Sequence, residues 1–291
     1  GKQYSQTQQI RGTAVFEKAN PSDFPDWVSW VHTFTEPACY FDTSMSIYSN
    51  LALERWKGAK NEWNGSCFGI AGSNALAFRF RDRFYDKFPY LPHFADPVTV
   101  WADESMITIV SEIFSHQFGN PTKNGREHYD PKPTQTLQDI RQMLRQDEST
   151  IRTLSMWYKG PNGGGHNVLP YKLERVSNTS PLWNVFVYDN NEPEDTTARV
   201  VIDTSANGNQ GWWGYSNLNW SGSKLIQLEE PSEVYFGNAT LAKSQRAQSP
   251  FILSSGMLEI NNTKDAFIQI KDEIGNISGF KNDTVSRGIP G

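Results

Sequence analysis

Apolar residues first recur with a helical period between residues 67 and 84. Phe68, Ala71, Ala75 and Phe78 follow one another at intervals that place them on one face of an α-helix. Because such a stripe is normally turned toward the core, we expect this face to be buried. The segment therefore predicts a long amphipathic helix.

Two further segments carry the same period, residues 104–118 and residues 134–148. Thr134 or Thr136 is a suitable N-cap for the second of these helices, because a side-chain oxygen can accept a hydrogen bond from an N–H group of the first turn. The predicted apolar stripe of that helix consists of Leu137, Ile140, Met143 and Leu144.

From residue 151 onward the chain contains short runs of β-branched and aromatic residues, which are typical of strands. We expect strands at residues 151–158, 166–174, 183–188, 198–203 and 224–228. The segment 205–223 is rich in Gly, Asn and Trp, and is expected to be a long loop near the end of the sheet. Helices first and strands afterwards predict an α+β fold rather than alternating βαβ units.

The two ends of the chain differ in character from its centre. Residues 1–22 are polar and are expected to form a loose arm or an edge strand. Composition and rhythm change again between residues 240 and 249, after which only short strand-like runs occur. We therefore predict one domain over residues 1–245 and a small β-rich module over residues 246–291.

The overall composition argues against two classes of partner. The chain has 291 residues and a formal net charge of −5, so it has no broad basic field with which to bind nucleic acid. It contains no run of 18 apolar residues, so we expect no membrane-spanning segment. The chain begins at Gly1 without a Met, and it is rich in Asn, Trp and Tyr with few cysteines. We therefore expect a secreted or cell-surface bacterial protein whose leader was removed.

Cys67 carries the strongest chemical signal in the sequence. It follows the turn residues Gly65 and Ser66 and begins the first predicted helix. A thiol at a helix N-terminus lies in a positive field that favours the nucleophilic thiolate, and the N–H groups there can bind an oxyanion. The other cysteine, Cys39, is expected to be a small buried hydrophobic residue. A disulfide between the two is possible, but it would consume the candidate nucleophile.

His166 and Asp189 are the candidates for a base and for the acid that orients it. His166 follows a run of three glycines and begins a predicted strand, while Asp189 ends the strand at residues 183–188. In the functional interpretation, Asp189 accepts a hydrogen bond from Nδ1–H of His166 and stabilises the imidazolium. The alternatives are a core histidine bonded to backbone and an acid that only forms a turn. Asn190 is a candidate to orient the imidazole in place of Asp189.

Several other residues are candidates for supporting roles. Asn61 and Asn64 precede Cys67 by six and three residues, so either amide is a candidate to help the Cys67 N–H hold an oxyanion. Turn formation is the simpler interpretation of each. The candidates for lining a substrate cleft are Trp212, Trp213, Gly164 and Gly165. The alternative for the tryptophans, Trp220 included, is that their rings only cap the sheet.

Taken together, the stretches around Cys67, His166 and Asp189 resemble those of the papain-like cysteine peptidase superfamily, and within it the bacterial bacteriocin-processing group. The stretch from Gly65 to Phe68 is similar to the family's Gly-Ser-Cys-aromatic turn. The stretches 165–168 (Gly-His-Asn-Val) and 187–190 (Val-Tyr-Asp-Asn) are similar to its Gly-His-x-Val and Val-Tyr-Asp-x-Asn patterns. The resemblance covers roughly residues 60–195.

The resemblance implies a helical N-terminal half with the nucleophile at the start of a long helix, packed on an antiparallel sheet that carries the histidine and the acid. It implies Cys67 as nucleophile, His166 as base and Asp189 as the third member. The family's oxyanion amide is usually a Gln six residues before the cysteine, and here that place is held by Asn61, whose side chain is shorter.

The sequence thus predicts a thiol hydrolase that cleaves peptide bonds in a peptide or protein substrate. One alternative is a transglutaminase-like acyltransferase, although His166 lacks the Trp that often follows two residues later in that family. Another is a non-catalytic module that binds peptide or glycan on the same fold. We expect no metal and no cofactor, because the histidines lack metal-ligand spacing and Gly163–Gly165 is not followed by the Lys of a phosphate loop.

Overall fold

The chain divides into two units, residues 1–242 and 243–291. The computed structural model describes, in the first unit, residues 24–42, 47–62, 66–89, 104–120, 122–123, 131–145, 150–160, 164–192 and 194–241. In the second unit it describes five short strands. The polar arm expected at residues 1–22 lies outside the described residues.

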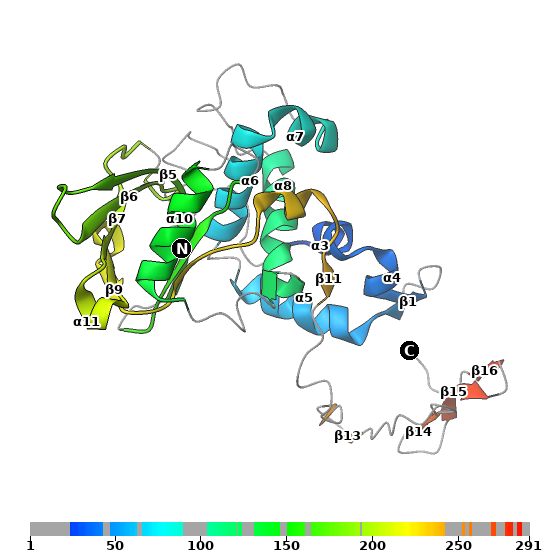
Figure 1. Cartoon of the computed structure of the whole chain (residues 1–291). Coiled ribbons are helices and arrows are strands. Elements are labelled where there is room, and N and C mark those ends of the chain that lie inside the picture. Colours follow the sequence, from blue (N-terminus) through cyan, green and yellow to red (C-terminus); the bar gives the residue numbers. More distant parts are fainter. Residues whose placement is uncertain are drawn as a thin grey trace. The chain divides into compact units, whose positions relative to one another are not determined.

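Most described helices of the first unit precede its main sheet in the chain (Figure 1). The helices, including three 3₁₀ turns, are α3 (Trp27–Phe34), α4 (Glu36–Cys39), α5 (Asn50–Glu62), α6 (Cys67–Arg79), α7 (Arg81–Lys87), α8 (Glu104–Ser115), η4 (His116–Phe118), α10 (Pro133–Arg145), α11 (Ala206–Asn209), η5 (Ser216–Leu218) and η6 (Ser232–Phe236).

The main sheet has seven strands in the order β10-β4-β5-β6-β7-β8-β9, and every neighbouring pair is antiparallel. Its strands are β4 (Leu154–Tyr158), β5 (Gly164–Arg175), β6 (Leu182–Tyr188), β7 (Arg199–Asp203), β8 (Trp212–Tyr215), β9 (Trp220–Gly222) and β10 (Ile226–Leu228). The sheet curls, so that the ring of Tyr158 in β4 stacks on that of Trp220 in β9 with centroids 5.9 Å apart. Two short pairs lie elsewhere in the unit: β1 (Tyr40–Asp42) with β2 (Ile47–Tyr48), and β3 (Gly119–Asn120) with β11 (Thr240–Leu241).

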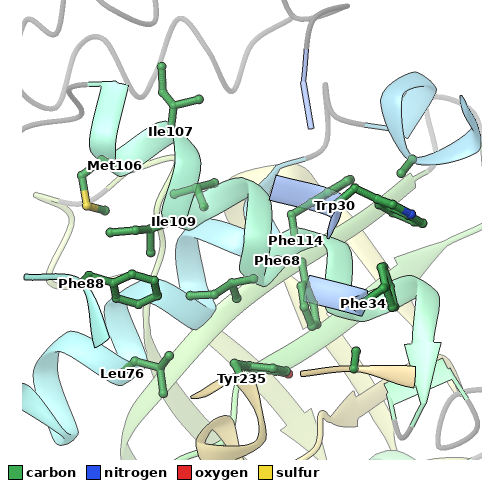
Figure 2. Packing of buried hydrophobic residues seen from close by; sticks show 14 of the residues in the cluster. Trp30, Phe34, Phe68, Leu76, Phe88, Met106, Ile107, Ile109, Phe114 and Tyr235 are labelled. Atoms are coloured by element: carbon green, nitrogen blue, oxygen red, sulfur yellow. The ribbon is translucent and has the colours of Figure 1, made fainter. Parts of the chain in front are cut away.

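The helical half is built around an aromatic and aliphatic core, shown in Figure 2. Among its fully buried members are Trp30, Phe34, Leu76, Phe84, Ile109 and Phe114. Burial of each large apolar side chain contributes about 1.5–3 kcal/mol, so this core fixes how the helices are arranged.

Two glycines let α6 lie close against α8. A Cβ atom at Gly69 would stand 2.3 Å from the carbonyl oxygen of Val110, and one at Gly72 would stand 2.6 Å from a methyl carbon of Ile113. Neither space admits a side chain. The position of α6, and with it the position of Cys67, therefore depends on these small residues.

A second core lies between the sheet and α10. Leu137, Ile140 and Met143 of α10 pack on strand residues such as Val185, Val200 and Ile202. Strand β5 contributes to this core on both sides of a register shift between Pro170 and Lys172. Val168 and Leu173 are an odd number of residues apart, yet both pack on the core, as an extra residue in one strand allows.

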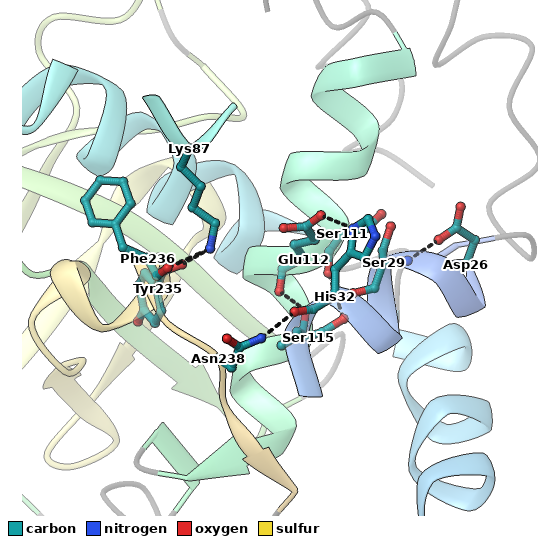
Figure 3. Close-up of polar contacts among 11 residues, drawn as sticks. Asp26, Ser29, His32, Lys87, Ser111, Glu112, Ser115, Tyr235, Phe236 and Asn238 are labelled. Carbon is teal, nitrogen blue, oxygen red and sulfur yellow. Dashed lines mark hydrogen bonds and ion pairs between the residues drawn. The ribbon is translucent and has the colours of Figure 1, made fainter. Parts of the chain in front are cut away.

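The segment that follows the sheet ties it back to the helices (Figure 3). Lys87 Nζ donates hydrogen bonds to the carbonyl oxygens of Tyr235 and Phe236, at 3.3 and 2.9 Å. Asn238 Nδ2 donates to the carbonyl oxygen of His32 at 2.9 Å. The backbone N–H of Ala239 donates to the carbonyl oxygen of Thr33. The segment after the sheet is thus bonded to α7 and to α3.

The second unit contains two small antiparallel groups of strands. The pair is β12 (Ile252–Leu253) with β13 (Gly256–Met257), and the three-stranded group is β14 (Gln269–Lys271), β15 (Ile277–Lys281) and β16 (Thr284–Ser286). The domain boundary at residues 245/246 stays a prediction.

The α+β class is confirmed, with helices and an antiparallel sheet. Three local predictions are wrong. Phe78 is 71% exposed, because the face of α6 that meets α8 is formed by smaller residues. Leu144 is 37% exposed near the end of α10. Thr134 and Thr136 lie inside α10 rather than capping it, and their hydroxyls donate to Asn209 and Ile226 carbonyl oxygens.

The predicted loop at residues 205–223 is also wrong. The segment contains strands β8 and β9, which extend the sheet by pairing with β7 and with each other. Gly and Asn residues suggested a loop, but the alternating buried Trp213 and Tyr215 belong to the core. Tertiary packing has overridden local propensity here.

Candidate active site

Cys67 is the first residue of α6, as the turn before it predicts. The first N–H groups of this 13-residue helix have no intrahelical partner, and the side chain of the N-cap residue Ser66 does not bind them. The sulfur therefore lies where the helix field is positive. Sγ is 3.9 Å from the carbonyl oxygen of Gly165 in β5, and the residue is 4% exposed.

His166 lies on β5 beside this helix start. Its side chain is a hydrogen-bond neighbour of Cys67, and its Nε2 lies 2.9 Å from Oδ1 of Asp189. The nitrogen that faces Asp189 is therefore Nε2, and the prediction of an Nδ1–H bond to Asp189 is wrong. Since Nε2 is occupied by the carboxylate, Nδ1 is the nitrogen left for the sulfur.

Asp189 follows β6 and is held by more than the imidazole. The N–H of Asn191 donates to its Oδ1 at 2.7 Å, and the hydroxyl of Tyr215 in β8 donates to its Oδ2. The Tyr215 ring also stacks near the His166 ring, with centroids 6.3 Å apart and planes 25° from parallel. Three donors and a ring contact thus orient the carboxylate and the imidazole together.

The electrostatics of this group follow from its burial and pairing. Burial alone would lower the pKa of His166, but the hydrogen bonds and charges of Asp189 and Cys67 raise that pKa from 6.5 to about 10. Burial alone would raise the pKa of Asp189, but the hydrogen bond and charge of His166, with Tyr215 and Asn191, lower it. Burial and the Asp189 charge raise the pKa of Tyr215, so its hydroxyl remains a donor. The arrangement favours a protonated imidazole between two acidic groups.

No protein-family model, curated protein or solved structure matches this chain. Within the described ranges, no three His, Cys, Asp or Glu residues are grouped as metal ligands would be. No helix in the described part of the chain is long and apolar enough to cross a membrane.

The supporting residues expected near Cys67 are only partly described. Asn61 lies in the last turn of α5, but its side chain is outside the described set, and so is all of Asn64. Asn190 is described, and its side chain does not take the place of Asp189. It is 1% exposed, and neither of its amide atoms has a hydrogen-bond partner in the described structure.

The residues predicted to line a substrate cleft lie in different environments. Trp213 is fully buried in the core under α10 and donates its indole N–H to the carbonyl oxygen of Lys224, so its assignment to a substrate cleft is wrong. Its neighbour Trp212 points to the other side of β8 and is 38% exposed. Gly164 and Gly165 are exposed at the start of β5, and Gly165 is the residue whose carbonyl oxygen lies near the sulfur.

Sequence reasoning missed Tyr215, because the segment around it was interpreted as a loop. An alternation of Trp213 and Tyr215 with smaller residues was the available strand signal. Glu229, which directly follows β10, is 2% exposed and accepts a hydrogen bond from Ser155. Ser155 in turn accepts one from Asn167 at 2.7 Å, which joins β4 to β5 next to His166.

Proposed function

We propose that this protein is a thiol hydrolase that cleaves peptide bonds, with a papain-like arrangement of its site. One observation carries the proposal: Cys67 at a helix start has as its neighbour an imidazole whose far nitrogen is held by a buried carboxylate. A base must be oriented and its charged form stabilised before it can activate a nucleophile. Each of these requirements has a named residue in this site.

In the proposed reaction, Cys67 Sγ attacks the carbonyl carbon of a peptide bond while His166 holds the thiol proton at Nδ1. The N–H groups at the start of α6 stabilise the oxyanion. The imidazolium then gives its proton to the leaving amine, and the C–N bond breaks. The imidazole, now neutral, takes a proton from water, and the hydroxide attacks the acyl carbon. The C–S bond then breaks, the acid leaves, and the thiolate and the imidazolium are restored.

Asp189 has a supporting role in this scheme. Its Oδ1 keeps the proton of Nε2–H in place, so that Nδ1 can exchange a proton with the sulfur. Tyr215 and the N–H of Asn191 hold the carboxylate. We further propose that the enzyme works outside a bacterial cell, which rests on composition alone.

The test compares the two cysteines with a thiol probe. The full chain is treated at pH 7 with a peptidyl vinyl sulfone, and the modified residue is found by mass spectrometry. We expect labelling of Cys67 and not of Cys39, because Cys39 is fully buried and burial raises its pKa to about 11. Cys39→Ala should leave the labelling rate unchanged, and His166→Gln should lower it by at least about tenfold.

Hydrolysis is then assayed on an unbiased peptide mixture by counting new termini. Products that depend on Cys67 and His166 support the proposal. Incorporation of a labelled amine in place of water would favour an acyltransferase instead. If Cys67 is inert toward the probe in folded protein and no new termini appear, a non-catalytic binding module is the better explanation.

A further inference from the structure

A cavity of about 450 Å³ lies between the end of α10 and the hairpin of β5 and β6, away from the residues of the proposed reaction. Three of the residues that line it are cations, Arg141, Arg145 and Lys172. The others are aliphatic or aromatic: Leu144, Tyr171, Leu173 and Trp183. The volume is within the range of sites that bind small ligands or short peptide segments.

The two arginines of α10 have no acidic partner among the described residues. They are four residues apart on one helix, so their side chains are neighbours and repel each other. Arg141 is held with its guanidinium carbon 5.2 Å from the Trp183 ring centroid, a stacking contact that leaves its N–H edge available. A like-charged pair fixed in this way is complementary to carboxylates, which guanidinium groups bind through two parallel hydrogen bonds.

The other nearby cations are already engaged. Lys172 Nζ lies 2.6 Å from Oε1 of Glu174, and Arg175 donates to the carbonyl oxygens of Ser180 and Asn178 at 2.6 Å each. Arg175 also lies near the Trp183 ring, at 5.7 Å from its centroid. Arg141 and Arg145 are therefore the groups that remain for an anionic ligand, in a protein whose net charge is −5.

We infer that this cavity binds an extended acidic peptide segment in which carboxylates alternate with an apolar residue, as in Glu-Leu-Glu. Side chains two residues apart on an extended chain are about 6.6 Å apart and share one face, which matches neighbouring arginines on a helix. The residue between them faces the other way and can pack on Leu173 and Trp183 of the hairpin. The site does not depend on Cys67, so this inference stands or falls separately from the proposed reaction.

The test measures binding of a fluorescein-labelled Glu-Leu-Glu-Glu-Leu-Glu peptide to the full chain by fluorescence anisotropy. Cys67→Ala is present in every sample so that the peptide is not cleaved. We expect saturable binding that weakens as salt is added, because the contacts are between charges. The double variant Arg141→Gln with Arg145→Gln should weaken binding by at least about tenfold.

Two controls make the result specific. Arg81→Gln with Arg83→Gln removes the same number of charges from α7, where Arg83 already pairs with Glu233 at 3.0 Å, and should change the affinity less than about twofold. A peptide with Gln in place of Glu should not bind. Should the double variant fail to fold by circular dichroism, Arg145→Gln alone is used and should still weaken binding.

Equal binding of the Gln peptide, or unchanged affinity in a folded Arg141/Arg145 variant, would overturn the inference. Displacement of the peptide by a single-stranded oligonucleotide at lower concentration than by unlabelled peptide would also overturn it, because the site would then select polyanions of another class.

Discussion

Nε2 of His166 and Oδ1 of Asp189 lie 2.9 Å apart, and both side chains are shielded from water. Two groups that are costly to bury as separate charges are thus buried as a pair. The second oxygen of the carboxylate receives the hydroxyl of Tyr215, so the pair is satisfied at both ends. This pairing sets the charge of the imidazole that stands beside Cys67.

Replacing Asp189 by Asn should lower the pKa of His166. The amide oxygen can still accept the Nε2–H bond, but the negative charge that helps hold the pKa at about 10 is gone, while the burial that lowers it remains. Titration of the imidazole by nuclear magnetic resonance, with His166→Gln to assign the signal, measures the shift. An unchanged pKa in Asp189→Asn would mean that the carboxylate does not control the imidazole.

The stability of the protein should fall as the pH rises from about 6.5 to about 10. In this interval folded His166 keeps its proton, whereas the unfolded residue, with an ordinary pKa of 6.5, has released it. The native state then binds more protons than the unfolded state, so its extra stability is complete below pH 6.5 and is lost through pH 10. The slope from this residue is at most about 1.4 kcal/mol per pH unit.

Urea unfolding at several pH values measures this dependence, and the slope should be smaller in His166→Gln. The opposite sign holds for Asp189, whose pKa is lowered from 3.8: its contribution is present above that value and is lost as the pH falls further. Equal slopes in wild type and His166→Gln would show that another group is responsible for the alkaline limb.

Tyr215→Phe should destabilise the protein and raise the pKa of Asp189. The variant removes one hydroxyl that donates to a buried carboxylate, and a hydrogen bond to a charged group contributes about 1.5–3 kcal/mol. Tyr171→Phe is the matched control, because that tyrosine is 48% exposed and its hydroxyl donates only to the carbonyl oxygen of Thr196. Its effect should stay within about 0.5 kcal/mol. Similar losses of unfolding free energy in the two variants would contradict the role given to Tyr215.

Local signals were sufficient to predict where the helix of Cys67 begins and which strand carries His166. A turn, a thiol and a run of small apolar residues lie within a few positions of one another, so the sequence contains the whole feature. The part played by Tyr215 was not predictable in this way. Its strand is only four residues long and is held by pairing with β7, a contact that depends on residues far away in the chain.

Dependence on residues far away in the chain also explains why the sequence did not distinguish the two tryptophans. Trp212 and Trp213 are adjacent in sequence and were both candidates for a cleft, but neighbouring residues of a strand point to opposite faces. Only the register of β8 on β7, which pairs Ile202 with Trp213, decides which ring enters the core. Which ring nitrogen of His166 faces Asp189 depends likewise on how the ring is oriented between β5 and α6. Residue types alone do not reveal that orientation.

The position of Cys67 should be sensitive to a single methyl group on the far side of its helix. Gly69→Ala would place a Cβ atom 2.3 Å from the Val110 carbonyl oxygen, which is backbone and cannot rotate away, so α6 must shift. Overpacking of this kind costs about 1–3 kcal/mol, although alanine is the better helix former. Gly58→Ala in α5 is the matched control, since nothing lies within 4 Å of its added Cβ. Gly58→Ala should stabilise the protein by about 0.5–1 kcal/mol.

Urea unfolding and the rate of Cys67 labelling are measured for both variants. We expect Gly69→Ala to lower both quantities and Gly58→Ala to leave the labelling rate unchanged. If Gly69→Ala stabilises the protein as Gly58→Ala does, then α6 and α8 are not packed as closely as the structure has them, and the sulfur is not positioned by that contact.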